Sequence, residues 1–439
     1  DVPGPRTSFN ILITSCFCFI AGISLLIVSH QSNEIEKDAF SKFEPQRAAA
    51  FKWSYPDEDW NAAEADAALK NVRQYFEAQE VNDFSREISG SWRMEGPGNI
   101  GGRLNAIAQD PFDSNHILAG SAAGGLFGTN DGGVNWSSLT DDFAWMAMGT
   151  IAFHPTQEGT VYIGTGDPQI SSHPRLGDGV HRSVDGGATW THLGLDSARI
   201  VSKILILEDT PEVIMAATMG NPAVKGPDRG LYRSSNSGTT WDHVLLPSDS
   251  AGVNDLAYDS STGIMIASGW NRLRNSTRSL VVGPESKLYR SDDSGITWAS
   301  VNNPWGNENR CRIGLSEHNG VFFALVVGLN MQIDNIYKST DGGMNWSPII
   351  SDTSPLANAL GGFGWYFSKI RVNPWNSEDI TLLGVDAWNS LDGGVTWDLL
   401  TPVWWEYSVH ADKHDLQWVG PNSAILATDG GAYRTDDHG

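Results

Sequence analysis

Short apolar runs alternate with turns rich in Gly and Asp over most of this chain, from residue 92 to its C-terminus. Apolar runs bounded by Gly, Pro, Asn and Asp are typical of β-strands. In one stretch, "MGTIAFHPTQEGTVYIGTGD" is followed by "GVHRSVDGGATWTHL". This pattern predicts a strand ending near a proline, a second strand, a third that ends at an acidic turn, and a fourth that starts at Trp190.

The acidic turn "SVDGGATW" recurs along the chain, and its copies are spaced 45 to 57 residues apart. A four-stranded unit repeated about every 50 residues is typical of a β-propeller, in which stacking buries the sheet faces that one blade leaves open. We therefore predict an all-β fold, a propeller of at least seven four-stranded blades. The Asp position of the turn is occupied by Asp131, Asp185, Asn236, Asp293, Asp341, Asp392 and Asp437.

A structural role explains the repeated turn better than a catalytic role does. Gly accepts the positive φ of a tight hairpin, and Asp accepts hydrogen bonds from nearby backbone N–H groups. One copy carries Asn236, which would abolish acid–base chemistry but keeps an acceptor oxygen. We expect these side chains to contact the backbone and not a substrate.

The turns resemble the Asp-box, or BNR, repeat (Ser/Thr-x-Asp-x-Gly-x-Thr/Ser-Trp), and the resemblance covers residues 92–439. Asp-boxes occur in sialidases, sortilin-type receptor propellers and xyloglucanase-type glycosidases. The resemblance implies a propeller whose boxes lie away from the ligand face, but it specifies no reaction. The arginine cluster of sialidases is missing, since "GGRLNAI" offers Arg103 only. Sialidase chemistry is therefore disfavoured.

The N-terminal part differs in composition from the repeats. Residues 11–29 carry no charge and are long enough to span a bilayer, so residues 1–37 are predicted to be a signal peptide or signal anchor with its flanks. Residues 38–91 are predicted to be a helical lead-in, with a helix over 61–80, before a propeller over 92–439. We expect an extracytoplasmic protein, secreted or membrane-anchored, with membrane contact through residues 11–29 only. Because "RTDDHG" stops inside a turn, we expect a fragment of a longer protein.

Net charge and cysteine content limit the classes of partner and cofactor that we expect for this chain. The 439 residues include 29 Lys and Arg against 52 Asp and Glu, a net charge of −23. This acidity argues against nucleic-acid binding, which depends on phosphate neutralisation, and is compatible with cation binding. No cofactor is expected, and a divalent cation stays an alternative. Cys311 is the only cysteine after the N-terminal segment, and "RCRIGL" predicts a buried thiol on a strand.

Loops at one end of the central channel are the expected ligand sites of a propeller. The first candidate is the long loop "GTGDPQISSHPRLGDG" at residues 164–179, with Asp167, His173 and Asp178. Long loops on a rigid scaffold often carry function. A plain turn cluster is an equal alternative for this one.

The second candidate is "PVWWEYSVHADKHDL" at residues 402–416. On a strand, His410, Asp412 and His414 would share one face, where they could hold a divalent metal or hydrogen-bond to one another. Aromatic side chains near this segment and in "GGFGWYF" are candidates for sugar stacking or for core packing. They are Trp365, Tyr366, Trp404 and Trp405.

The third candidate is "ILATDGGAYRTDDHG" at residues 425–439. It resembles the "TDIGGAYR" segment of xyloglucanase-type glycosidases, which implies a catalytic role for Asp429. The equivalent first-repeat segment carries Ala122 and Ala123 and no acid, a departure from that family. A second carboxylate would have to come from Asp167 or Glu406, since an inverting glycosidase needs two.

Three functions follow as hypotheses. The first is an extracytoplasmic module that binds a peptide or glycan at the channel mouth. The second is a glycoside hydrolase acting on a polysaccharide. The third is a metal-bound scaffold without a substrate. Two opposed carboxylates, one with a raised pKa, would distinguish the hydrolase from the binding module.

Overall fold

The computed structural model describes residues 101–439, apart from His173, residues 276–277, residues 351–354, Trp404, Trp405 and Tyr407. Before residue 101 it describes only Ala67 and Asn71, both helical. The predicted targeting segment and nearly all of the lead-in therefore lie outside the described residues. None of the helices among the described residues is long and apolar enough to cross a bilayer.

Seven antiparallel sheets form the blades, as the repeat predicted. Blade 1 contains β1 (Leu104–Gln109), β2 (Ile117–Ser121), β3 (Leu126–Thr129) and β4 (Ser137–Ser138). Blade 2 contains β5 (Met148–Phe153), β6 (Val161–Thr165), β7 (Val180–Ser183) and β8 (Thr191–His192). Blade 3 contains β9 (Val201–Ile206), β10 (Ile214–Thr218), β11 (Gly230–Ser234) and β12 (Asp242–Leu245). Blade 4 contains β13 (Ala251–Asp259), β14 (Ile264–Asn271), β17 (Leu288–Ser291) and β18 (Ala299–Ser300).

The later blades follow the same order. Blade 5 contains β19 (Ile313–His318), β20 (Val321–Val327), β21 (Ile333–Ser339) and β22 (Ser347–Pro348). Blade 6 contains β23 (Lys369–Asn373), β24 (Asn376–Leu383), β25 (Ala387–Ser390) and β26 (Asp398–Leu399). Blade 7 contains β27 (Lys413–Trp418), β28 (Ala424–Thr428) and β29 (Gly431–Thr435). Outside the blades lie the hairpin β15 (Leu273–Arg274) and β16 (Ser279–Leu280), and the 3₁₀ segments η1 (Asp196–Ala198) and η2 (Pro355–Asn358).

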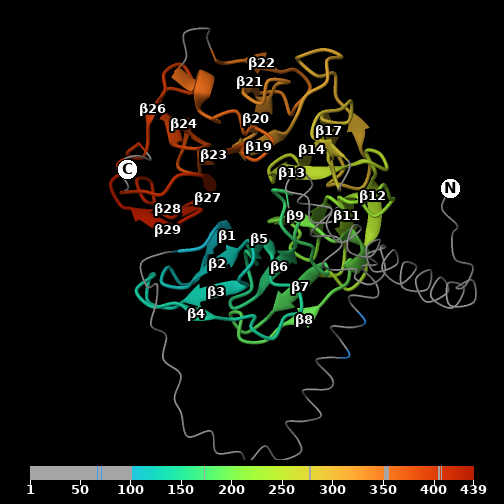
Figure 1. Cartoon of the computed structure of the whole chain (residues 1–439), viewed down its shortest axis with the longest axis vertical. Coiled ribbons are helices and arrows are strands. Elements are labelled where there is room, and N and C mark those ends of the chain that lie inside the picture. The colour runs from blue at the N-terminus through green and yellow to red at the C-terminus, as the bar shows by residue number, and fades with distance from the viewer. Residues whose placement is uncertain are drawn as a thin grey trace, which may run out of the picture. The chain divides into compact units, whose positions relative to one another are not determined.

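The blades close into a ring with the first strand of each blade innermost (Figure 1). Neighbouring first strands lie side by side, and β27 lies beside both β23 and β1. The ring is closed by apolar contacts, in which Leu104 and Ile107 of blade 1 pack with Ile425 and Ala427 of blade 7. Burying a Leu or Ile side chain contributes about 1.5–3 kcal/mol. Closure therefore needs no covalent link between the first and last blades.

Apolar clusters also join consecutive blades, which explains why second strands are apolar on both faces. Every residue of β6 and of β10 is buried. In one cluster, Tyr162 of blade 2 packs with Val201 and Ile204 of blade 3. Cys311 is fully buried, as predicted, in another such cluster, and burial raises its pKa to about 12. It does not lie on a strand, because β19 begins only at Ile313.

The repeated turns make the contacts that the sequence predicts. In blade 2, the Asp185 carboxylate accepts hydrogen bonds from the Ser183 hydroxyl at 2.7 Å and the Thr189 backbone N–H at 2.8 Å. The side chain of Asn236 accepts the equivalent bonds in blade 3, from Ser234 and Thr240. The amide and the carboxylate are thus interchangeable as acceptors here, and the turn is architectural.

Candidate active site

The direction of the strands brings the candidate residues to one end of the channel. First strands begin and second strands end at this mouth, whereas the acidic turns join third and fourth strands at the opposite end. Asp167 follows β6, and Asp429 follows β28. Arg103 directly precedes β1, and Tyr366 lies shortly before β23. Four blades therefore contribute to the same mouth.

Asp167 is fully buried and held from several sides. Its Oδ2 accepts a hydrogen bond from Nη2 of Arg103, in an ion pair. Its Oδ1 accepts from the Asn105 side chain at 3.3 Å and from the backbone N–H of Gln169 at 3.1 Å. A carboxyl group that pairs with a guanidinium and has both oxygens hydrogen-bonded is suited to positioning other groups.

Arg103 links Asp167 to the aromatic loop before β23. Its Nη1 donates to the Tyr366 hydroxyl, and its guanidinium lies 5.5 Å from the centre of the Tyr366 ring. Burial alone would lower the pKa of Arg103, but Asp167 and then Tyr366 raise it above its ordinary value. Burial raises the pKa of Tyr366 to about 12, and the Asp429 carboxylate acts in the same direction. Asp429 therefore lies close enough to raise the pKa of both Arg103 and Tyr366.

Asp429 is held by a buried histidine. Nε2 of His414 lies 2.6 Å from its Oδ1, and the side chain of Asp429 keeps 30% of its surface exposed. The His414 ring is fixed between Tyr366, at 5.1 Å between centroids, and Phe367, at 5.8 Å. Asp429 is thus a rigidly oriented carboxylate that still reaches solvent.

Asp412 lies next to Asp429, and its environment raises its pKa. Its backbone carbonyl accepts a hydrogen bond from the Asp429 N–H at 3.1 Å, and its φ of 64° marks a sharp bend before β27. Burial, and then the charge of Asp429, raise the pKa of Asp412. Asp412 and Asp429 are therefore neighbouring carboxyl groups in unlike environments, an arrangement that recurs in acid–base sites.

The structure assembles some of the predicted residues and separates others. Asp167, Tyr366, Asp412, His414 and Asp429 lie together at the mouth. Trp365 is half-buried beside Tyr366, at 5.3 Å between centroids. Glu406 is exposed in the β26–β27 connection, where its backbone N–H bonds to Val403. Three predicted ligand residues, His173, Trp404 and Trp405, lie outside the described residues.

The strand geometry expected for His410, Asp412 and His414 is wrong. β27 begins at Lys413, so His410 and Asp412 precede it, and His414 turns its Nε2 to Asp429. The His410 ring instead packs against Gly430, where a Cβ would come within 2.5 Å of it. In the part of the chain that the structure describes, the residues placed closely enough to share a metal ion are Asp178, His181 and His192.

Sequence reasoning missed several polar residues that support the mouth. Arg312 donates to the Gln169 side chain at 2.5 Å and to the Tyr366 carbonyl at 3.1 Å. It directly precedes β19, as Arg103 precedes β1. An arginine immediately before a first strand is the signal that would have found both, because first strands begin at the mouth.

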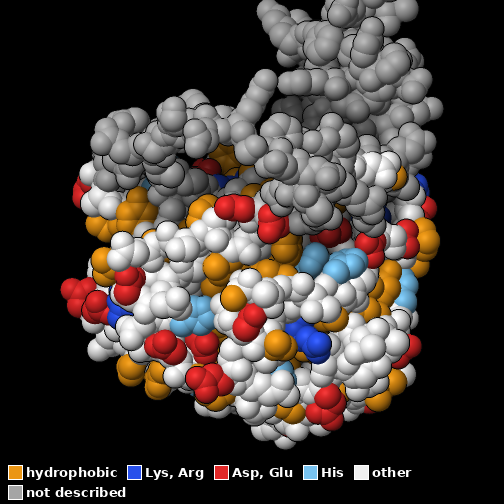
Figure 2. Space-filling model, turned by 90° about the horizontal axis from the view of Figure 1, so that it is seen from below, with side chains coloured by type: hydrophobic (Ala, Val, Ile, Leu, Met, Phe, Trp, Pro, Cys, Tyr) orange, Lys and Arg blue, Asp and Glu red, His pale blue; other side chains and the backbone are white. Residues whose placement is uncertain are grey.

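The surface agrees with the net charge. Figure 2 shows acidic side chains spread over one side of the molecule, with few basic side chains among them. Among the described side chains drawn on that side, Lys and Arg form no continuous stripe of the kind that tracks a phosphate backbone.

The sequence of this chain is similar to those of several xyloglucanases. The chain is 24% identical over 360 residues to a xyloglucanase of Acetivibrio thermocellus, and 24% identical over 368 residues to one of a Paenibacillus species. It spans 40% and 33% of the length of those two relatives, while 72% and 74% of the chain is covered. No protein-family model matches the chain.

Two solved structures share the fold. The GH74 xyloglucanase of Xanthomonas campestris superposes with a TM-score of 0.59 at 17% identity, covering 79% of this chain and 54% of that one. An ancestral GH74 enzyme superposes with a TM-score of 0.61 at 15% identity, covering 79% of this chain and 46% of that one. These likenesses support the propeller architecture.

Proposed function

We propose that this chain is a glycoside hydrolase that acts on a xyloglucan-type polysaccharide at the mouth of its propeller. The observation that carries the proposal is the adjacent pair of unlike carboxyl groups, Asp412 with its raised pKa and the histidine-held, part-exposed Asp429. The similarity to xyloglucanases supplies the substrate class. The sequence by itself favoured binding without turnover, whereas we propose hydrolysis.

The roles follow from the environments of the two acids. Asp412 is the general acid and gives its proton to the glycosidic oxygen as the bond to the anomeric carbon breaks. Asp429 is the general base and takes a proton from the water that attacks this carbon. In this scheme Asp412 replaces Asp167 and Glu406 as the partner of Asp429. Asp167 is not assigned a proton transfer, because Arg103 and Asn105 already occupy both of its carboxyl oxygens.

The rest of the mouth positions the sugar. The Tyr366 hydroxyl is fixed by Arg103 and stays protonated at neutral pH, since its pKa is about 12. Tyr366 and Trp365 present aromatic rings next to the acid pair, and aromatic faces suit the apolar faces of sugar rings. We assign them to substrate binding.

The test is hydrolysis by the purified chain of 439 residues, with xyloglucan and unsubstituted β-glucans as substrates. We expect release of reducing ends from xyloglucan, and a loss of about 10²-fold or more in Asp412→Asn and Asp429→Asn. Binding of xyloglucan without turnover in the wild type, unchanged in both variants, would refute hydrolysis.

One observation favours a second candidate, glycan binding without turnover. Blade 1 has the buried Ala122 after its second strand, where blade 7 has Asp429. A mouth that lacks this acid keeps its aromatic and polar surface but loses one carboxylate. The same assay separates the two candidates, because a binding module retains xyloglucan in affinity electrophoresis and releases no product.

We also propose that the seven turns are Asp-box repeats and that the chain is exported. The first is supported by the shared hydrogen-bond pattern of Asp185 and Asn236. The second is supported by the uncharged run at residues 11–29. Fractionation of cells that express the chain with its N-terminal residues tests the second proposal, and recovery only in the cytoplasm would contradict it.

A further inference from the structure

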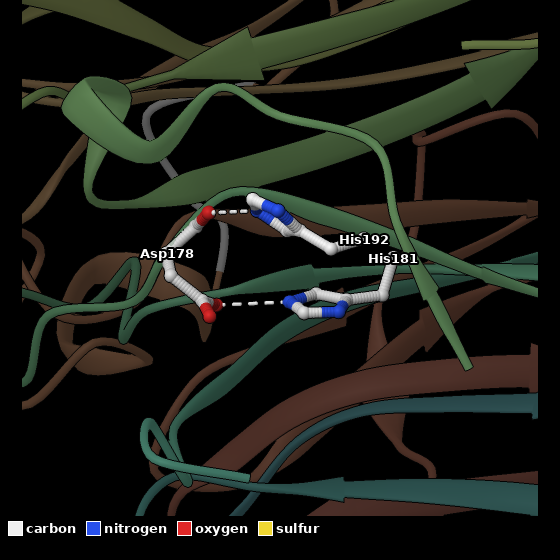
Figure 3. Close-up of side chains that lie close together, drawn as sticks. All are labelled: Asp178, His181 and His192. Atoms are coloured by element: carbon white, nitrogen blue, oxygen red, sulfur yellow. Dashed lines mark hydrogen bonds and ion pairs between the residues drawn. The ribbon is translucent and has the colours of Figure 1, made fainter. Parts of the chain in front are cut away.

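Two histidines and an aspartate lie together on blade 2, away from the acid pair at the mouth. Figure 3 shows the imidazoles of His181 and His192 side by side, each with a ring nitrogen directed at Asp178. Their candidate ligand atoms all lie within 4.8 Å of one another. We propose that Asp178, His181 and His192 bind one divalent transition-metal ion, with Zn²⁺ as the best match. This inference does not depend on the proposed hydrolysis.

Strand pairing sets the two histidines opposite one another. His181 of β7 is the register partner of His192 of β8, and their ring centroids are 4.8 Å apart. Ligand atoms around a tetrahedral zinc ion at about 2.1 Å lie about 3.4 Å apart, so modest side-chain rotations complete the site. Two imidazoles and one carboxylate are a common set for zinc, with open positions left for water.

A glycine bend brings the carboxylate over this pair. Gly179 has a φ of 106°, and a Cβ at this position would lie 2.0 Å from the Gly194 carbonyl oxygen, so a side chain is excluded there. The bend lets the Asp178 carboxylate reach Nε2 of His181 at 2.9 Å. The Asp178 backbone N–H is itself fixed by the buried Thr165 hydroxyl at 2.8 Å. The backbone around Gly179 therefore fixes the position of the Asp178 carboxylate.

The charge of the ligands suits a cation. One carboxylate and two imidazoles offer an anionic oxygen and two neutral nitrogens, a ligand set that suits a divalent transition-metal ion. His181 is buried and His192 is 38% exposed, so the ion would be reached from the His192 side.

Blade 3 provides an internal comparison. There His243 places Nε2 2.8 Å from the Arg229 carbonyl, as His192 places Nε2 2.8 Å from the Asp178 carbonyl. The register partner of His243 is Tyr232, which cannot serve as a zinc ligand of this kind. The histidine–carbonyl bond is thus common to blades 2 and 3, whereas His181 and the Asp178 carboxylate have no counterpart at the corresponding positions of blade 3.

Binding requires His192 to exchange its bond to the Asp178 carbonyl for a bond to the ion. The exposure of its side chain leaves room for this rotation. Asp178 lies at the end of the loop that follows β6, and Asp167 lies at the start of the same loop. An ion here would fix the base of a loop that reaches the channel mouth.

The experiment is a ZnCl₂ titration of chelator-treated full chain at pH 7.5 by calorimetry, with Co²⁺ absorption as the readout of coordination. We expect one ion per chain and a rise in Tm on binding. Asp178→Asn keeps an acceptor for His181, and His192→Gln keeps a donor for the carbonyl, so both variants are expected to fold. Each should weaken binding at least tenfold.

His243→Gln is the matched control, because it changes the equivalent histidine of blade 3 and should leave the affinity unchanged. Circular dichroism of each variant shows whether the fold is retained. Absence of stoichiometric binding in the wild type would overturn the proposal. So would affinity that survives Asp178→Asn and His192→Gln but is lost in His410→Ala, since the ion would then lie at the mouth.

Discussion

The two ends of the propeller use aspartate in different ways. At the end with the acidic turns, Asp185 bonds to Ser183 and Thr189, two and four residues away. At the mouth, Arg103 joins Asp167 and Tyr366, which lie 64 and 263 residues from it. The six repeated aspartates of the turns, like Asn236, are therefore structural. The acids proposed for catalysis occur once each and depend on ring closure.

The physical environments differ in the same way. Hydrogen bonds from the Thr189 side chain and backbone lower the pKa of Asp185 to about 2, which fits an acceptor at the surface. Burial and Asp429 raise the pKa of Asp412. Local bonds thus keep a turn carboxylate ionised, and burial beside a like charge favours a protonated acid at the mouth.

The largest expected effect is on stability, from breaking the ion pair at the mouth. Arg103→Met leaves the fully buried Asp167 carboxylate without its cation, which should cost about 3 kcal/mol in the free energy of unfolding. Urea unfolding measures this cost. Arg434→Met is the control, because the Arg434–Asp436 pair is exposed and should contribute less than about 1 kcal/mol. An equal loss of unfolding free energy in the two variants would show that the ion pair at the mouth is no more important than the exposed pair.

The next effect is on catalysis. Asp429→Asn should lower kcat/KM on xyloglucan by about 10²–10³-fold, because the general base is lost. Stability should change little, since the Asn side-chain oxygen still accepts from Nε2 of His414. Asp392→Asn in the turn of blade 6 should leave kcat/KM unchanged. A comparable loss in both variants would show that the effect is not specific to the mouth.

The pH dependence tests the coupling between Asp412 and Asp429. Because the pKa of Asp412 is raised in the fold, its protonated form contributes stability below its ordinary pKa of about 3.9. That contribution is lost as the pH rises through the higher pKa of the folded state. In Asp429→Asn the pKa of Asp412 should fall, because the neighbouring negative charge is removed, while burial keeps part of the shift. Carboxyl-carbon NMR titration measures it, and an unchanged value would contradict the coupling.

The smallest effect is expected in the turns. Asp185→Asn should change the free energy of unfolding by less than about 1 kcal/mol at pH 7, because Asn236 already fills this role in blade 3. The depressed pKa of Asp185 stabilises the fold above about pH 4, and this stabilisation is lost as the pH falls toward 2. The difference in Tm between the wild type and Asp185→Asn should therefore shrink at low pH. A constant difference would mean that the carboxylate charge plays no part.

Much of the fold was predictable from local patterns. The seven turns set the phase of the strands, and that phase placed Asp167 and Asp429 correctly after second strands. The same reasoning failed for Asp412, because it assumed a strand where the chain bends with a positive φ. A single sharp bend changes which side chains face one another, and no periodicity signals it.

What the sequence determined by itself is the blade, because its strand pairs, turns and capping hydrogen bonds all join residues of a single repeat. What only the tertiary structure decided is which residues meet. Closure of the ring brings Arg103 of blade 1 to Tyr366, and the β7–β8 register with Gly179 brings His192 and His181 to Asp178. The reason is that hydrogen bonds within a turn are fixed by local geometry, whereas contacts across blades depend on the packing of the whole ring.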